Sequence, residues 1–298
     1  MKVGLQIPSY TWPGGAEAIA PMLGRVVRTA DEVGFDSIWV MDHFFQIRSV
    51  GPVTDPMLEG WTTLGWMAAN TSRARLGLMV GGIHYRQPGL WLKAATTLDV
   101  LSGGRAWLGI GAAWNQQESE GLGFVFPPLA ERFELLEDAL RFAHAMWQGE
   151  RGSEGPLDGH HVQATRLLNS PQALTRPHPP IMVGGGGERK TLRLVARYAD
   201  ATNVFGGPEG IAHKYRVLRE HCEAIGRPYD EIERSTLQSV DPAAHGHAGG
   251  ESAGRIVDRL GELADAGAQH VVVNLRGTAD PGRLETLGRD VIPALRGL

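Results

Sequence analysis

The chain has 298 residues, of which 42% are hydrophobic and 21% are charged, a balance typical of globular proteins. Its net charge of −4 and pI near 6.3 argue against a nucleic-acid partner, and no basic run suggests one. A single cysteine, Cys222, excludes an internal disulfide framework. No apolar run approaches the about 18 residues of a membrane helix, and no signal-peptide core begins the chain. We therefore expect a soluble, cytoplasmic protein.

Apolar runs rich in β-branched residues alternate with helical patterns along the chain. Eight runs resemble buried strands, at residues 3–7, 37–41, 74–80, 106–110, 180–183, 201–205, 232–240 and 270–275. Helical patterns follow them at 16–33, 57–69, 88–101, 129–147, 188–198, 208–225, 250–266 and 282–295. Eight strand–helix units predict a (β/α)8 TIM-like barrel, α/β in class, as one domain spanning residues 1–298. A doubly wound open sheet is the alternative.

Two segments interrupt this alternation. Residues 148–174, after the fourth unit, are too long for a plain connection and suggest a hairpin near 157–168. Residues 241–252 are polar and rich in glycine, alanine and histidine. We expect both insertions at the C-terminal end of the barrel, where long loops cover a site. Their histidines, at positions 160, 161, 245 and 247, have no carboxylate or cysteine at ligand spacing, so the sequence predicts no metal site.

The fifth strand pattern leads directly into four glycines. Pro179 and Pro180 precede the apolar run, and Gly184–Gly187 connect it to a helical pattern. Glycine permits positive φ and lets a ligand approach the backbone. A helix N-terminus offers N–H donors, and Arg189 and Lys190 add positive charge. The segment predicts an anion site, most simply for a phosphate, with a flexible turn that binds nothing as the alternative.

Small and aromatic residues follow the neighbouring strand patterns. In a barrel these positions meet at the C-terminal end of the strands, where the chemistry of such folds lies. The small residues, at 81–82 and 111–113, leave room for a broad flat molecule, and Trp12, Phe44 and Trp114 would form walls. Beside a phosphate site, this combination predicts a flavin-like cofactor. Tight packing at the barrel rim is the alternative.

Four longer segments carry a family resemblance. They are VMDHF, LGLMVGGIHYRQPGLWLKAATTLDVLSGGRAWLGIGAAW, FPPLAERFELLEDAL and PHPPIMVGGGGERKTLRLVARYAD. With them the chain resembles the luciferase-like monooxygenase superfamily, and more narrowly its coenzyme F420-dependent oxidoreductases of the actinobacterial type. The resemblance implies a TIM-like barrel with the cofactor across its mouth, and a bulged third strand with a non-prolyl cis peptide near Met79, Val80 and Gly81. It also implies hydride transfer between the deazaflavin C5 and a small organic substrate.

The resemblance further assigns roles to single residues. His43 would be catalytic, as a proton partner. The cofactor would contact Asp42, His43, Met79, Val80, Gly81, Gly111, Ala112, Ala113, Asn115, Gly184, Gly185, Gly186, Gly187 and Arg189. The substrate pocket would include Trp12, Phe44 and Trp114. Trp114 stands where the family's alcohol and sugar-phosphate dehydrogenases carry an acidic residue, and we expect Glu118 to be helical and turned away, so we expect a reductase.

Two other functions remain open at this point. One is an FMN-dependent monooxygenase of the luciferase-like type, and the other is a flavin- or deazaflavin-binding protein without turnover. Superfamily members commonly pair through barrel helices, so we expect a homodimer through residues 57–69 and 88–101. The pocket walls carry no readable code for the substrate.

Overall fold

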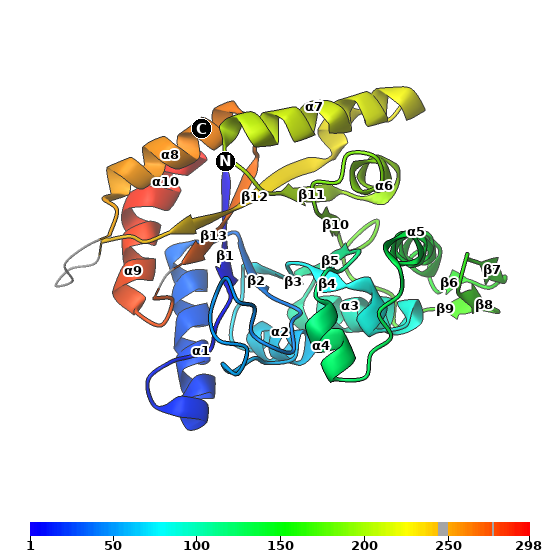
Figure 1. Cartoon of the computed structure of the whole chain (residues 1–298), viewed down its shortest axis with the longest axis horizontal. Coiled ribbons are helices and arrows are strands. Elements are labelled where there is room, and N and C mark those ends of the chain that lie inside the picture. Colours follow the sequence, from blue (N-terminus) through cyan, green and yellow to red (C-terminus); the bar gives the residue numbers. More distant parts are fainter. Residues whose placement is uncertain (244–249, 276) are drawn as a thin grey trace.

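The computed structural model describes residues 1–243, 250–275 and 277–298, which form a closed parallel barrel inside a layer of helices (Figure 1). The barrel strands are β1 (Lys2–Ile7), β2 (Ser37–Val40), β3 (Arg75–Leu78), β5 (Ala106–Gly111), β10 (Ile181–Gly184), β11 (Ala201–Val204), β12 (Glu233–Val240) and β13 (His270–Leu275). Each strand pairs in parallel with the next, β13 pairs with β1, and β10 pairs with β5. The predicted (β/α)8 barrel is confirmed, and the open-sheet alternative is wrong.

Helices cover the outside of the barrel, apart from α4 (Gln116–Gly121), which lies at the C-terminal ends of the strands. The others are α1 (Gly15–Val33), α2 (Gly60–Ala68), α3 (Pro88–Ser102), α5 (Leu129–Met146), α6 (Thr191–Tyr198), α7 (Pro208–Ile225), α8 (Ala253–Asp265), α9 (Pro281–Thr286) and α10 (Ile292–Arg296). In α1, residues 23, 26, 27 and 30 are buried on one face, the spacing of an amphipathic helix. Gly34 then ends α1 with a φ of 103°, a left-handed cap that glycine adopts without strain. The chain can therefore turn directly from α1 toward β2.

Large side chains fill the barrel interior. Trp39, Trp107 and Met182 belong to an inner apolar cluster, separate from the larger core between strands and helices. The two indole rings meet edge to face, with centroids 5.6 Å apart. A Cβ at Gly77 would lie 2.6 Å from the Trp39 ring, so glycine is required beside it. Because the interior is filled, a ligand site must lie at one end of the barrel.

A hydrogen-bond chain closes the floor, which we define as the N-terminal ends of the strands. His270 lies between Ser37 Oγ, at 2.9 Å from its Nε2, and Glu233 Oε1, at 2.8 Å from its Nδ1. Lys2 Nζ donates to the other Glu233 oxygen at 2.6 Å. Burial alone would raise the pKa of Glu233, but His270 and Lys2 lower it to about 2. These hydrogen bonds connect the N-terminal ends of β1, β2, β12 and β13.

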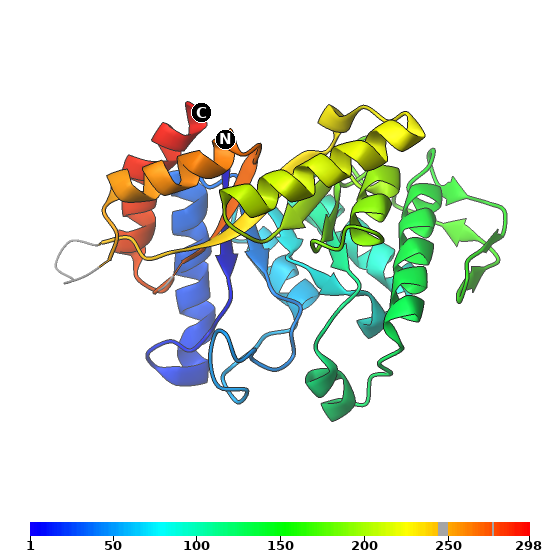
Figure 2. The same cartoon turned by 45° about the horizontal axis from the view of Figure 1, so that its top comes forward.

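The first insertion forms two short antiparallel pairs. They are β6 (Gly152–Ser153) with β9 (Leu167–Leu168), and β7 (Leu157–Asp158) with β8 (Gln163–Ala164). The hairpin predicted near 157–168 is confirmed. Its expected place over the C-terminal end is wrong, because the pairs lie beside α5 on the outside of the helical layer (Figures 1 and 2).

Two aspartates on the helices hold this insertion. Asp138 of α5 is fully buried and accepts hydrogen bonds from the backbone N–H groups of His160 and His161. Asp99 of α3 accepts the N–H groups of residues 174 and 175. The insertion lies away from the mouth because of the direction of the helix before it. Helix α5 carries the chain from the C-terminal end of the barrel back to the floor, so the connection between α5 and β10 begins at the floor.

The second insertion is described only at its edges. Residues 244–249, with two of the histidines considered for metal binding, lie outside the described residues. Pro242 and Glu251 form an isolated bridge on either side of them. In the described part of the chain, no helix is both long and apolar enough to cross a membrane.

Candidate active site

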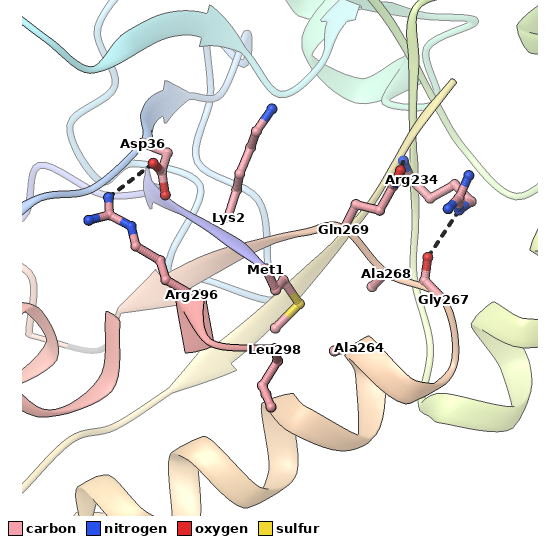
Figure 3. Close-up of a pocket in the computed structure, with 10 residues that line it drawn as sticks. All are labelled: Met1, Lys2, Asp36, Arg234, Ala264, Gly267, Ala268, Gln269, Arg296 and Leu298. Atoms are coloured by element: carbon pink, nitrogen blue, oxygen red, sulfur yellow. Dashed lines mark hydrogen bonds and ion pairs between the residues drawn. The ribbon is translucent and has the colours of Figure 1, made fainter. Parts of the chain in front are cut away.

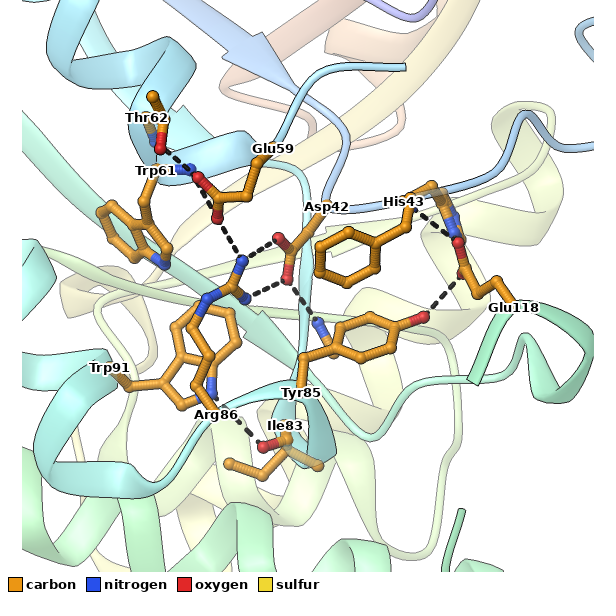
Figure 4. Close-up of polar contacts among 12 residues, drawn as sticks. Asp42, His43, Glu59, Trp61, Thr62, Ile83, Tyr85, Arg86, Trp91 and Glu118 are labelled. Atoms are coloured by element: carbon orange, nitrogen blue, oxygen red, sulfur yellow. Dashed lines mark hydrogen bonds and ion pairs between the residues drawn. The ribbon is translucent and has the colours of Figure 1, made fainter. Parts of the chain in front are cut away.

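Asp42 forms a clamp at the mouth, which we define as the C-terminal ends of the strands. It follows β2, is 3% exposed, and receives two hydrogen bonds of 2.8 Å from Arg86. Glu59 holds the same guanidinium, and the N–H of Gly82 donates to Asp42 at 3.3 Å (Figure 4). Burial raises the pKa of Asp42 to about 6, against the opposing effect of Arg86. Asp42 thus ties the end of β2 to the bulge after β3, and little of it is left to contact a cofactor.

His43 points the other way, toward a buried carboxylate (Figure 4). Its Nδ1 lies 2.5 Å from Glu118 Oε1, and the same oxygen accepts the Tyr85 hydroxyl at 2.6 Å. Glu118 Oε2 accepts the backbone N–H groups of Phe44 at 2.7 Å and Phe45 at 3.1 Å. Burial alone would raise the pKa of Glu118, but the hydrogen bond from His43, with those from the other donors, lowers it. The carboxylate is ionised and surrounded by donors.

Glu118 was expected to lie in a helix, which is confirmed, and to turn its side chain away from the site, which is wrong. The residue lies in α4 but is fully buried, facing the loop that follows β2. That loop presents two backbone N–H groups that need an acceptor, and the first turn of α4 lies close enough to supply one. The nearest signal in the sequence was the acidic residue itself, three positions after Asn115 at the start of a short helix.

The other ring nitrogen of His43, Nε2, has no hydrogen-bond partner within the described residues. The side chain is 16% exposed. Trp114, which is 64% exposed, places its ring edge to face with the imidazole at a centroid distance of 5.3 Å. A partly exposed imidazole with one free nitrogen can accept or donate a proton at the mouth.

The bulge after β3 has the predicted geometry. The peptide bond between Met79 and Val80 is cis, which confirms the expectation at these residues. Gly81 and Gly82 form β4 and pair with the end of β5. The side-chain amide of Gln6, from inside the barrel, donates to the carbonyl of Met79 at 3.3 Å. Strands β1, β3 and β5 therefore hold the bulge in common.

Val80 explains two of the glycines at the mouth. A Cβ at Gly111 would lie 3.1 Å from Val80 Cγ2, and one at Gly184 would lie 2.7 Å from the same atom. Both positions are therefore small because Val80 packs across the gap between β5 and β10. Tight packing, the alternative interpretation of these small residues, accounts for Gly111 and Gly184.

The wall after β5 is open at the following residues. Ala112 and Ala113 are half-buried, and Ala113 has a left-handed φ of 59°. A Cβ at Gly82 would lie 3.2 Å from the Cβ of Ala113, so the bulge and this wall face each other closely. Asn115 caps the start of α4 by position, and its carbonyl accepts the hydroxyl of Ser119 at 2.8 Å.

The glycine loop after β10 differs in part from the prediction. Gly185 has a φ of 119°, which favours glycine, but its N–H donates to the Asn203 carbonyl at 2.9 Å. That donor continues the pairing with β11 and is not available to a phosphate. The sequence predicted a helix from residue 188, but α6 begins at Thr191. The donors that remain for an anion are those of Gly186 and Gly187.

Side chains around this loop supply further polar groups. A Cβ at Gly187 would lie 2.8 Å from the Thr191 hydroxyl, and one at Gly186 would lie 3.5 Å from Lys214 Cε. Lys214 Nζ pairs with Glu188 at 2.6 Å. Arg189 is exposed and makes no ion pair within the described part of the chain. Thr191 and Lys214 belong to the candidate anion site and were missed by the sequence analysis.

The three aromatic residues expected in one substrate pocket are separated. Trp12 lines a hollow of about 540 Å³ between the loops after β1, β12 and β13, with residues that include Ser9, Asn274 and Thr278. Phe44 packs instead on Tyr85, with ring centroids 5.1 Å apart. Trp114 places its ring edge to face with His43.

A second hollow, of about 610 Å³, lies at the floor (Figure 3). Its charged groups are already paired: Arg296 donates to Asp36 at 3.0 Å, and Arg234 donates to the carbonyl of Gly267 at 3.1 Å. It lies at the opposite end of the barrel from His43 and offers no comparable chemistry. Among the described residues, no group of histidine, cysteine and acidic side chains is arranged to hold a metal ion.

Comparison with known proteins agrees with the fold. Residues 1–270 match the family model described as luciferase-like monooxygenase. The chain belongs to the luciferase-like monooxygenase family. Of its relatives, an F420-dependent glucose-6-phosphate dehydrogenase from Kineococcus radiotolerans is 32% identical over 232 residues, which cover 75% of this chain and 65% of that protein. The match therefore spans slightly less than two thirds of that relative's length.

Solved structures of this luciferase-like fold carry both kinds of cofactor. An F420-dependent secondary alcohol dehydrogenase in complex with an F420–acetone adduct superposes with a TM-score of 0.81 and 15% identity, covering 99% of both chains. A riboflavin lyase with modified FMN superposes with a TM-score of 0.82 and 13% identity, covering 100% of this chain and 91% of that one. Nearly equal scores show a shared fold and do not distinguish deazaflavin from flavin.

Proposed function

We propose that this luciferase-like protein is an F420-dependent oxidoreductase that moves a hydride between its cofactor and a small organic substrate at the mouth. The observation that carries the proposal is the setting of His43, whose Nδ1 is held by Glu118 while Nε2 has no hydrogen-bond partner among the described residues. The F420-dependent relative, at 32% identity, favours the deazaflavin over FMN.

The residues at the mouth fit such a cofactor. Ala112 and Ala113, both half-buried, form a wall of small side chains after β5, and Ala113 faces Gly82 of the bulge. Gly186 and Gly187, with the neighbouring hydroxyl and cationic side chains, would hold its phosphate. F420, when bound, supplies a two-electron carrier that accepts or gives a hydride at C5.

His43 would move the proton that accompanies the hydride. In oxidation, a substrate hydroxyl or amine loses its proton to Nε2 while its carbon loses a hydride; in reduction, both return. The expectation of a reductase rested on a missing acidic residue at Trp114. Glu118 places a carboxylate behind His43, but it is fully buried and does not reach the substrate, so it does not replace that residue, and we propose that the protein acts mainly as a reductase.

Cofactor titration followed by single-turnover kinetics tests the proposal. The protein is titrated with F420 and with FMN, and F420 absorbance is then followed with substrate panels in both directions. Reduced F420 is offered activated alkenes, quinones and imines, and oxidised F420 is offered alcohols and sugar phosphates. Binding of FMN without F420 would support the flavin monooxygenase, and F420 binding without transfer to any substrate would support the binding protein.

We also propose a homodimer through α2 and α3. Trp66 on α2 is 38% exposed, and Leu90 and Leu101 on α3 are 60% and 71% exposed. Apolar side chains exposed on two neighbouring helices are suited to burial against a second copy. Light scattering at micromolar concentration should give twice 32.2 kDa, and a monomer mass would contradict the proposal.

A further inference from the structure

We infer that Glu118 is a positioning residue that fixes the tautomer of His43, with the proton on Nδ1 and the lone pair of Nε2 directed to the mouth. The use of that lone pair in hydride transfer rests on the proposed function. The tautomer itself is a property of this chain and can be measured without any cofactor.

The donors around Glu118 determine the direction of the hydrogen bond to His43. Backbone N–H groups of Phe44 and Phe45 can only donate, and they occupy Oε2. The Tyr85 hydroxyl donates to Oε1, and burial raises the pKa of Tyr85, so it keeps its proton. A carboxylate among such donors carries no proton to give. The Nδ1 of His43 must therefore donate, at 2.5 Å.

A neutral imidazole that donates from Nδ1 has its lone pair on Nε2. Within the described residues, nothing else competes for that nitrogen. The ring is also fixed in direction, because the same carboxylate holds the backbone of the next two residues. A catalytic imidazole oriented by a carboxylate on its far nitrogen is the arrangement that lets histidine act as a base in triad enzymes. Glu118 touches neither substrate nor cofactor in this role and acts through His43.

Glutamine at position 118 separates the tautomer from packing. In Glu118→Gln the side-chain amide can donate to Nδ1, which moves the imidazole proton to Nε2. Tyr85→Phe is the matched control, because it removes another hydrogen bond to the same oxygen and leaves the donation from His43 intact. A merely structural role would make the two variants alike.

Histidine ¹⁵N NMR on the cofactor-free protein is the deciding measurement. One signal set among the 11 histidines is assigned to His43 by its loss in His43→Asn. We expect a protonated Nδ1 and an unprotonated Nε2 in the wild type and in Tyr85→Phe, and the reverse in Glu118→Gln. A protonated Nε2 in the neutral wild-type ring overturns the inference, even if Glu118→Gln fails to fold. An unchanged tautomer in a folded Glu118→Gln overturns it as well.

Single-turnover hydride transfer then separates this inference from the proposed function. We expect Glu118→Gln to slow transfer by on the order of 10²-fold while F420 affinity stays close to wild type. Transfer as fast as wild type in a variant with the reversed tautomer would overturn the positioning role. If the wild type shows no F420 chemistry but has the expected tautomer, the proposed function fails and the assignment of Glu118 stands.

Discussion

Two histidine–carboxylate pairs lie at opposite ends of this barrel. His270 and Glu233 meet at the floor, 2.8 Å apart, and His43 and Glu118 meet at the mouth, 2.5 Å apart. The pairs differ at the second ring nitrogen. In His270 it lies 2.9 Å from Ser37 Oγ, and the side chain is 2% exposed. In His43 it has no partner within the described residues, and the side chain is 16% exposed.

The floor pair shows why connectivity alone does not define a catalytic site. Ser37, His270 and Glu233 are joined in the order of a hydrolase triad. Ser37 is, however, 1% exposed, and its oxygen also accepts the indole N–H of Trp39 at 2.7 Å. A Cβ at Gly4 would lie 2.3 Å from that oxygen, so no substrate atom fits beside it. At the floor both ring nitrogens of His270 are hydrogen-bonded, so the group has a structural role. At the mouth, Nε2 of His43 remains available for proton transfer.

The largest expected effect is at the mouth. His43→Ala should lower turnover by about 10²-fold or more, the usual scale of general acid–base help. The fold should be intact, because the remaining donors still hold Glu118. Single-turnover hydride transfer measures the effect, with circular dichroism as the check on folding. A rate equal to wild type would make His43 a packing residue and the two ends of the barrel equivalent.

At the floor, the same substitution should act on stability. His270→Ala leaves Glu233 with Lys2 as its remaining ion-pair partner and should cost about 3 kcal/mol of unfolding free energy, the low end for a broken buried pair. Urea unfolding measures it. F420 affinity and transfer per folded molecule should match wild type, which makes this variant the control for His43→Ala. If His270→Ala lost F420 binding or hydride transfer while its unfolding free energy stayed at the wild-type value, the floor pair would have the functional role and not the structural one.

Charge at the mouth should matter for the cofactor, and charge at the floor should not. Arg189→Ala should weaken F420 binding by about tenfold, the effect of one charge-assisted contact. Lys2→Ala removes a cation at the floor and should leave F420 affinity unchanged. Fluorescence titration of both variants tests the pair, and equal affinities would remove Arg189 from the anion site.

Acid should remove the contribution of His84 at the mouth before that of Glu233 at the floor, and this is the smallest effect. His84 follows the bulge, and burial, with the charge of Arg132, lowers its pKa from 6.5 to about 4. As pH falls below 6.5, the imidazole of His84 binds a proton in the unfolded chain and stays neutral in the folded protein. The free energy of unfolding therefore decreases between pH 6.5 and pH 4. For Glu233 the pKa is lowered from 4.5 to about 2, so its contribution is present above 4.5 and lost toward 2.

Urea midpoints measured against pH separate the two acid effects. His84→Gln should flatten the decline between 6.5 and 4, and Glu233→Gln should flatten the decline below 4.5. A His84→Gln curve parallel to wild type in the upper range would show that the lowered pKa at the mouth does not contribute to stability.

The sequence predicted the barrel because its signals are local. Eight apolar runs correspond to the eight barrel strands with ends shifted by a few residues, and the glycine after α1 caps that helix as its position suggests. The cis peptide at Met79–Val80 followed from the family resemblance. Such features depend on neighbouring residues or on a long shared segment.

Contacts between distant segments could not be predicted in the same way. Glu118 lies 75 positions from His43, and no spacing rule relates a short helix after one strand to the loop after another. The N–H of Gly185 looked available in the sequence, but it completes the pairing with β11. The 148–174 insertion was placed at the wrong end because its length was weighed without the direction of the helix before it.

The insertion has a practical consequence for engineering this barrel. Asp138 of α5 receives backbone N–H groups from the turn between its strands β7 and β8, and Asp99 of α3 receives those at the C-terminal end of the segment. The rest lies on the outside of the helical layer (Figure 2). It is an appendage with defined attachment points, suited to grafting a tag, a reporter or a surface anchor without rebuilding the cofactor end.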